Sequence, residues 1–214
     1  MSILEVNGLK KVYSTRLGGN KVEALKNVNF SVSEGEYVAI MGESGSGKTT
    51  LLNILAALDR PTSGSVMIDG RDLSKIKDSA VCAFRRDNLG FVFQDFNLLD
   101  TFTVEDNIYL PLVLAGKSYD EMHSRLEPIA KRLSITELLK KYPYEISGGQ
   151  KQRAAVARAL ITEPRMILAD EPSGIQSPPM NCCACSPRST PSVRLFLWSR
   201  TPSRRLPPQS ACSS

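Results

Sequence analysis

The sequence lacks the features that would point to a membrane-spanning or a nucleic-acid-binding protein. Its central apolar stretch, residues 110–115, is too short to cross a bilayer, and residues 1–10 contain no apolar core of a signal peptide. The formal net charge is +5, but all 22 acidic residues lie in 1–174 together with 22 of the 27 lysines and arginines. Because that part is balanced in charge, we expect no nucleic-acid partner.

Residues 175–214 contain no lysine, aspartate or glutamate at all. They hold seven of the 13 prolines, four of the five cysteines and the only tryptophan, Trp198. A segment of this composition buries little apolar surface and is typical of a disordered tail. Only residues 193–198 combine enough β-branched and aromatic side chains to predict a strand within it.

Two functional interpretations of residues 175–214 compete with the absence of any role. Cys182, Cys183 and Cys185 resemble a metal-ligand cluster, but the spacing lacks the further close ligands that a zinc site needs. A basic, proline-rich docking segment is the other alternative. We favour a segment with no selected role, on the grounds of its composition.

Residues 42–49 read Gly-Glu-Ser-Gly-Ser-Gly-Lys-Thr, which is the complete phosphate-loop pattern G-x-x-x-x-G-K-[ST]. The apolar run 36–41 before it predicts a buried strand, and 50–58 after it predicts a helix whose N-terminus favours anions. A plain glycine-rich turn does not account for all eight positions in this context. We expect a phosphate-binding set of Gly42, Ser44, Gly45, Ser46, Gly47, Lys48, Thr49 and Thr50, in which Lys48 meets the β- and γ-phosphates and Thr49 offers an oxygen to Mg²⁺.

A second acidic element follows the apolar run 165–169, which ends in Asp170 and Glu171. A strand that delivers Asp170 to its C-terminal end suits a Walker B element that holds Mg²⁺, and Glu171 then stands where a base could act on water. Taken alone, such a run more often marks a strand that meets a polar loop. Its occurrence in the same chain as a phosphate loop favours the Walker B interpretation.

Residues 147–150 read Ser-Gly-Gly-Gln and open a predicted helix over 150–160. The structural interpretation is an N-cap by Ser147, and the functional one is a second anion site at a helix N-terminus; both can hold together. At this point the sequence resembles the ATP-binding-cassette (ABC) ATPases, of which this is the signature motif. The resemblance extends over residues 1–174.

The resemblance implies an α/β fold with a P-loop NTPase core, an N-terminal antiparallel β part and a helical signature lobe over about 95–158, incomplete at the C-terminus. We expect strands at 4–6, 28–32 and 64–68 in the β part, and one domain over 1–174. ATP and Mg²⁺ are the implied cofactors. The implied site residues are Gln94 and Glu171 for catalysis, Thr49, Gln94 and Asp170 for Mg²⁺, Tyr13 for stacking on adenine, and Ser147, Gly148, Gly149 and Gln150 for the ATP of the partner subunit in a head-to-tail homodimer.

Residues 93–108 narrow the resemblance to the branch that serves macrolide exporters, lipoprotein-release systems and bacitracin-type antimicrobial-peptide resistance. That branch implies an ATP-hydrolysing subunit of a bacterial transporter. It also implies a transmembrane permease partner, which holds the subunit on the cytoplasmic face of the cell membrane. Residues 96–103 would lie near the permease docking groove.

The chain departs from the family after Gly174. The family continues with an aspartate-bearing D-loop and, further on, a switch histidine, whereas residues 175–179 read Ile-Gln-Ser-Pro-Pro. The only histidine, His123, precedes the signature and is expected to be a partly exposed residue of a helix over 119–133. We interpret 175–214 as the translation of a shifted reading frame, not native to the fold.

The departure leaves three functional hypotheses. The first is an active transporter ATPase, and the second is a nucleotide-binding remnant with impaired catalysis. The third, a non-transport ABC protein of repair or translation, fits less well because the chain has neither tandem cassettes nor long insertions. In the family, the missing segment supplies a strand between the phosphate-loop strand and the Walker B strand, and 193–198 is the part of the tail that could fill this gap.

Overall fold

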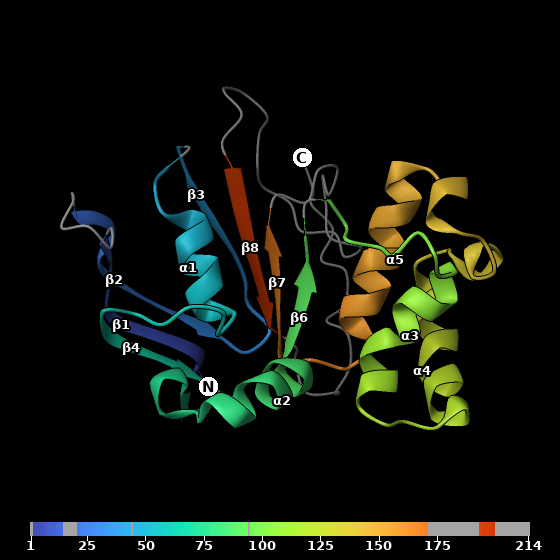
Figure 1. Ribbon diagram of the computed structural model, residues 1–214, viewed down its shortest axis with the longest axis horizontal. Coiled ribbons are helices and arrows are strands. Elements are labelled where there is room, and N and C mark those ends of the chain that lie inside the picture. Colours follow the sequence, from blue (N-terminus) through green and yellow to red (C-terminus); the bar gives the residue numbers. More distant parts are fainter. Residues whose placement is uncertain (1, 15–20, 44, 94, 171–192, 200–214) are drawn as a thin grey trace, which may run out of the picture.

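The computed structural model describes residues 2–14, 21–43, 45–93, 95–170 and 193–199 of the chain (Figure 1). An antiparallel sheet, a central sheet and a group of helices follow one another across the molecule (Figure 1). None of the helices within these ranges is long and apolar enough to span a membrane.

The antiparallel sheet has the strand order β2-β1-β4-β5. Leu4 of β1 lies opposite Val32 of β2 on one side and Ile68 of β4 on the other, and all three side chains are buried. Alternation of buried Leu4 and Val6 with exposed Glu5 turns one face of β1 towards the core. This sheet is the predicted N-terminal β part, with strands β1 Ser2–Ser14, β2 Lys21–Ser33, β4 Ser63–Ile68 and β5 Arg71–Asp72.

The central sheet has the order β3-β8-β7-β6 and consists of β3 Tyr37–Gly42, β8 Val193–Ser199, β7 Met166–Asp170 and β6 Leu89–Val92. β6 pairs with β7 in parallel, whereas β8 is antiparallel to both β3 and β7. The strand predicted for 193–198 is therefore present, and it occupies the position between the phosphate-loop strand and the Walker B strand. Because β8 opposes both neighbours, β3 and β7 run in the same direction.

Five α-helices lie within the described ranges. The bounds differ slightly from the sequence prediction, since the helix expected at 50–58 begins at Lys48 and ends at Leu55. Three short 3₁₀ helices, η1 Leu73–Lys75, η2 Thr136–Leu138 and η3 Pro143–Glu145, connect other elements. The α-helices are α1 Lys48–Leu55, α2 Asp78–Asn88, α3 Val104–Leu114, α4 Tyr119–Arg132 and α5 Gly148–Leu160.

The buried apolar side chains form two main clusters. The first joins the antiparallel sheet to the central sheet around α1, with Leu9, Ile54 and Leu168 fully buried. The second lies among α3, α4 and α5 and includes Ile108, Leu126 and Ile161. This helical group lies beside the β6 edge of the central sheet and corresponds to the predicted signature lobe (Figure 1). His123 lies on α4 and is exposed, as the sequence predicted.

Candidate nucleotide-binding site

The phosphate loop links β3, which ends at Gly42, to α1, which begins at Lys48. Gly47 caps α1 in the left-handed region with φ 91°, and a Cβ atom there would lie 2.3 Å from the carbonyl oxygen of Ala24. Only glycine fits such a position without strain or clash. The glycine before the lysine is therefore fixed by the backbone of this chain as well as by the phosphate-loop pattern.

Lys48 is the buried charge of the loop, with 6% of its surface exposed. Its ammonium donates to the carbonyl oxygen of Gly42 at 2.8 Å, to Ser46 Oγ at 2.9 Å and to the carbonyl oxygen of Glu43. An ammonium has three hydrogens to donate, and all three are satisfied by the loop itself. To bind a phosphate, Lys48 must exchange some of these bonds for bonds to the ligand.

The other predicted phosphate contacts cluster around this lysine. Gly42, Gly45, Ser46 and Gly47 lie in the loop, and Thr49 and Thr50 lie in the first turn of α1. Thr49 is exposed, so its hydroxyl is accessible at the helix N-terminus. Ser44 lies outside the described residues.

Asp170 ends β7 on the same edge of the sheet as the phosphate loop. Leu195 of β8 pairs with Ile40 of β3 and with Asp170, and β3 and β7 point the same way. The C-terminal edge of parallel strands is where open α/β sheets bind ligands. Gln94 and Glu171, the predicted catalytic residues, lie outside the described residues.

The signature motif begins α5 as the sequence predicted, although the helix starts two residues earlier, at Gly148. Ser147 Oγ accepts from the Gln150 amide at 3.4 Å, and Gln150 Oε1 accepts from the Ser147 amide at 2.8 Å. This capping box confirms the structural interpretation of Ser147. A Cβ atom on Gly148 or Gly149 would meet nothing within 4 Å, so packing within the described chain does not require glycine at either position.

Tyr13 lies near the end of β1 and its side chain is held by two charged neighbours. Its hydroxyl donates to Asp59 Oδ2 at 2.8 Å, and Lys11 Nζ lies 4.8 Å from the ring centroid. Lys11 also donates to Asp59 Oδ1 at 2.6 Å. Burial raises the pKa of the Asp59 carboxyl, but hydrogen bonds from Lys11 and Tyr13 lower it, and the net pKa lies below its ordinary value. Sequence reasoning identified Tyr13 but missed Lys11 and Asp59.

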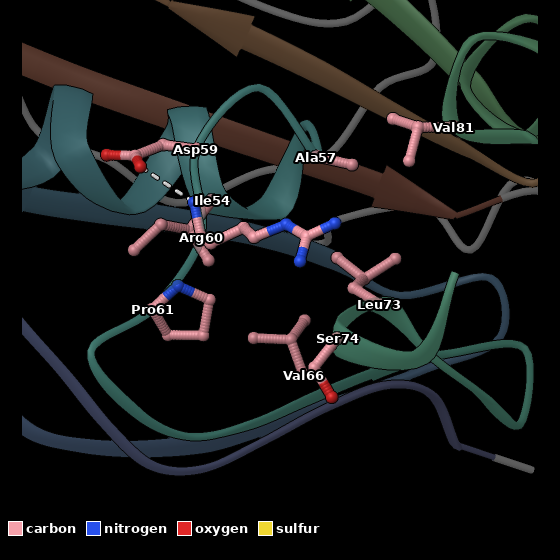
Figure 2. A pocket seen from close by; sticks show the side chains of 9 residues that line it. All are labelled: Ile54, Ala57, Asp59, Arg60, Pro61, Val66, Leu73, Ser74 and Val81. Atoms are coloured by element: carbon pink, nitrogen blue, oxygen red, sulfur yellow. Dashed lines mark hydrogen bonds between the residues drawn. The ribbon is translucent and has the colours of Figure 1, made fainter. Parts of the chain in front are cut away.

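A small cavity of about 30 Å³ lies beyond the C-terminal end of α1, where Ile54, Val66, Leu73 and Val81 line it together with the stem of Arg60 (Figure 2). Such a volume accommodates about one water molecule. The cavity lies at the end of α1 opposite the phosphate loop, and Asp59, which hydrogen-bonds to Tyr13, is one of its lining residues.

Two buried donors on α5 have no hydrogen-bond partner among the residues that the structure describes, namely Gln152 Nε2 and Arg153 Nε. Buried donors are normally paired, and an unpaired one costs about 1–3 kcal/mol. Both residues lie within three positions of the end of the signature motif, in the first turns of α5, so these turns hold donors without acceptors inside the described ranges. The sequence pattern gave no sign of this.

The ABC transporter family matches residues 25–174 of this chain. The ABC transporter ATP-binding protein YxdL of Bacillus subtilis (strain 168) is 51% identical over 173 residues, which cover 81% of this chain and 66% of that protein. The bacitracin export ATP-binding protein BceA of Halalkalibacterium halodurans is 49% identical over 174 residues, 81% of this chain and 68% of the relative. The chain thus spans about two thirds of the length of these relatives.

Among solved structures, the ATP-binding cassette MJ0796, a dimer in a post-hydrolysis state bound to ADP and Pi, is 41% identical to this chain. It matches with a TM-score of 0.71 over 80% of this chain and 75% of its own. The predicted family, its branch of macrolide-export, lipoprotein-release and antimicrobial-peptide resistance proteins, and the predicted cassette fold are confirmed. By its matched residues, its signature helix and its phosphate loop, the chain belongs to the ABC transporter family as an ATP-binding cassette.

Proposed function

We propose that this chain binds Mg-ATP as the nucleotide-binding subunit of a bacterial exporter of the antimicrobial-peptide, macrolide or lipoprotein type. The observation that carries the proposal is the phosphate loop, with buried Lys48 and the left-handed Gly47, on the same sheet edge as Asp170. The relatives' names support the transport role, since BceA is a bacitracin export protein. ADP bound to the MJ0796 cassette supports the ligand class.

Each predicted site residue has a role in this proposal. The amides of 45–49 and the Lys48 ammonium bind the phosphates, and the Tyr13 ring stacks on adenine. Thr49 and Asp170 offer the oxygen donors that Mg²⁺ prefers, at one edge of the sheet, and Gln94 completes the set. When bound, Mg²⁺ neutralises charge that develops on the phosphates. Glu171 acts as the base for the attacking water, and Gln94 orients that water.

The signature turn is proposed to complete the ATP site of a second copy in a head-to-tail homodimer. Gly148 and Gly149 are exposed, and a Cβ atom on either would meet no described atom within 4 Å, which favours close approach of a ligand to the helix N-terminus. The dimeric cassette MJ0796 supports this assembly. Ser147, Gly149 and the first amides of α5 would meet the γ-phosphate held by the partner.

The proposed second partner is a transmembrane permease, which would place the subunit on the cytoplasmic face of the membrane. Leu99 and Phe102, on the segment 96–103 named by the resemblance, are 43% and 40% exposed. Exposed apolar side chains of this size are suited to a protein contact. No nucleic-acid partner is proposed.

Impaired catalysis remains a second candidate for this particular chain. We propose that residues 1–174 form the cassette and that 175–214 are foreign to it, because the family's D-loop aspartate and switch histidine are absent from the sequence. The composition of 175–214, which lacks any lysine, aspartate or glutamate, supports this candidate. Nucleotide binding would then persist with little turnover.

The binding proposal is tested by Lys48→Ala and Tyr13→Ala, measured as ATP affinity by titration calorimetry. Lys48→Ala is expected to weaken binding more, because it removes charge-assisted bonds of roughly 1.5–3 kcal/mol each, whereas one stacked base contributes about 1–3 kcal/mol. Lys26→Ala, which removes an exposed lysine, serves as the matched control and should leave affinity unchanged. Equal or reversed effects of Lys48→Ala and Tyr13→Ala would place the nucleotide elsewhere.

A further inference from the structure

Arg158 of α5 makes two short contacts across the molecule, to the loop that follows β6. Its Nη1 donates to the carbonyl oxygen of Asn97 at 2.6 Å and its Nη2 to that of Phe96 at 2.6 Å. The two acceptors are consecutive in the chain and more than 60 residues away from Arg158. A planar guanidinium is suited to such a two-point contact, and an ammonium is not.

The two residues that Arg158 holds have unusual backbone conformations. Phe96 has φ 60° and Asn97 has φ 45°, both in the left-handed region that non-glycine residues seldom adopt. The Phe96 amide donates to the Phe93 carbonyl at 3.1 Å and the Asn97 amide to the Asp95 carbonyl at 2.6 Å, so the chain turns sharply here. Such conformations persist only where surrounding contacts hold them.

The charge of Arg158 is committed to these two carbonyls. It forms no ion pair with any residue inside the described ranges. Arg158 is half-buried, and this burial lowers the pKa of its guanidinium. A partly buried cation without a carboxylate needs good acceptors, and the turn supplies them.

The same loop has a second anchor further along. Asn107 of α3 is fully buried, accepts from the Leu99 amide at 2.7 Å and donates to the carbonyl oxygens of Leu99 and Phe102 at 3.0 and 3.2 Å. The segment that exposes Leu99 and Phe102 is therefore fixed by α3 at one end and by α5 at the other. Gln94 lies two residues before Phe96, the first of the two residues that Arg158 contacts.

We propose that Arg158 is a positioning residue that ties the signature helix α5 to the turn 95–97, so that the helix sets the position of the loop between Gln94 and the exposed Leu99. The inference rests on the proposed function for the role of Gln94, but the tie itself rests only on the described contacts. A shift of α5 on signature engagement would be carried along the helix to the loop. Loss of the two hydrogen bonds from Arg158 to the carbonyls of Phe96 and Asn97 would release the loop and leave the phosphate site intact.

The test is amide hydrogen exchange on the full chain with Arg158→Gln and Arg158→Lys, and with Arg125→Gln as a matched control. Arg125 lies on α4 of the same lobe and pairs with Glu121 at 2.6 Å, away from the loop. Exchange of residues 95–99 is expected to accelerate at least tenfold in both Arg158 variants and to stay unchanged in Arg125→Gln. ATP affinity is expected to stay within about threefold of the unmodified chain, since Arg158 is outside the phosphate loop.

A second variant separates positioning from general packing. Asn97→Gly lowers the cost of the left-handed turn at an exposed position, so it should restore slow exchange of 95–99 in the Arg158→Gln background. Unchanged exchange of 95–99 in Arg158→Gln, equal acceleration throughout α3–α5, or no rescue by Asn97→Gly would each overturn the proposal. Absence of ATP binding by the unmodified chain would instead overturn the proposed function and leave the exchange result standing.

Discussion

Asp59 joins the adenine-stacking candidate to the body of the cassette. Its carboxylate accepts hydrogen bonds from the Tyr13 hydroxyl and the Lys11 ammonium, and Lys11 also donates to the Arg60 carbonyl at 2.7 Å. The Tyr13 ring is held at its hydroxyl, has a cation 4.8 Å from its centroid and is 42% exposed, and this exposure is what the proposed stacking on adenine requires. The platform thus depends on a charge 46 residues away from the ring in the sequence.

This charge makes the stability of the cassette depend on pH. The pKa of Asp59 is lower in the folded protein, so its contribution is fully present above the ordinary pKa, about 3.9, and is lost as the pH falls through the depressed folded value. Asp59→Asn should therefore lower the melting temperature at pH 6–7, and the gap should shrink below about pH 4. Thermal unfolding between pH 2.5 and 7, with exposed Asp100→Asn as control, measures this; a constant gap down to pH 2.5 would refute it.

At the residue scale, the sequence predicted groups defined by local patterns and missed groups defined by distant contacts. Gly47 and Lys48 follow from eight consecutive positions, and Ser147 follows from a four-residue motif. Arg158 and Asp59 could not be predicted, because their partners lie in other elements and the local sequence around each is ordinary. The hydrogen bonds of Lys48 to its own loop could not be predicted either, because a sequence pattern does not indicate which acceptors an ammonium group contacts.

At the element scale, β8 is the support of the phosphate-loop strand. Among the described strands β3 pairs only with β8, from Tyr37 opposite Trp198 to Gly42 opposite Val193. β7 is likewise joined to β3 only through β8. The β-forming composition of 193–198 predicted the strand, but its direction could not be predicted, because alternation of side chains is the same in parallel and antiparallel pairing.

Leu195→Pro tests the support that β8 gives. Leu195 lies opposite Ile40 on one side and Asp170 on the other, and proline removes a backbone donor in the middle of a sheet. A typical free energy of unfolding is about 5–15 kcal/mol, and we expect Leu195→Pro to remove a large share of it. The urea midpoint should therefore fall, and ATP affinity should be lost. The matched control, Leu195→Val, keeps the donor and the β propensity and should preserve both.

An unchanged urea midpoint in Leu195→Pro would show that β3 stands without β8. Retained ATP affinity in a destabilised Leu195→Pro protein would show that the phosphate loop forms independently of the strand. Either result would separate the tail from the nucleotide site.

At the scale of the whole molecule, the part that resembles the ABC cassette, residues 1–174, differs from residues 175–214. The family match ends at Gly174, and the relatives share about half of their residues with this chain over a length of 173 or 174. The two main cores and the phosphate loop lie within that length. We therefore assign the residues that contact the nucleotide to 1–174, a supporting role in the central sheet to β8, and the limit on turnover to the departure from the family within 175–214.

The most direct measurement compares this chain with a chimera that joins residues 1–174 to the C-terminal part of YxdL, under identical ATP concentrations. Both proteins should bind ATP, and the chimera should hydrolyse it about 100-fold faster, because misplaced or missing positioning groups cost phosphoryl transfer on this order. Glu171→Gln in the chimera should remove that turnover. Comparable hydrolysis by the two proteins would contradict the claim that residues 175–214 limit catalysis.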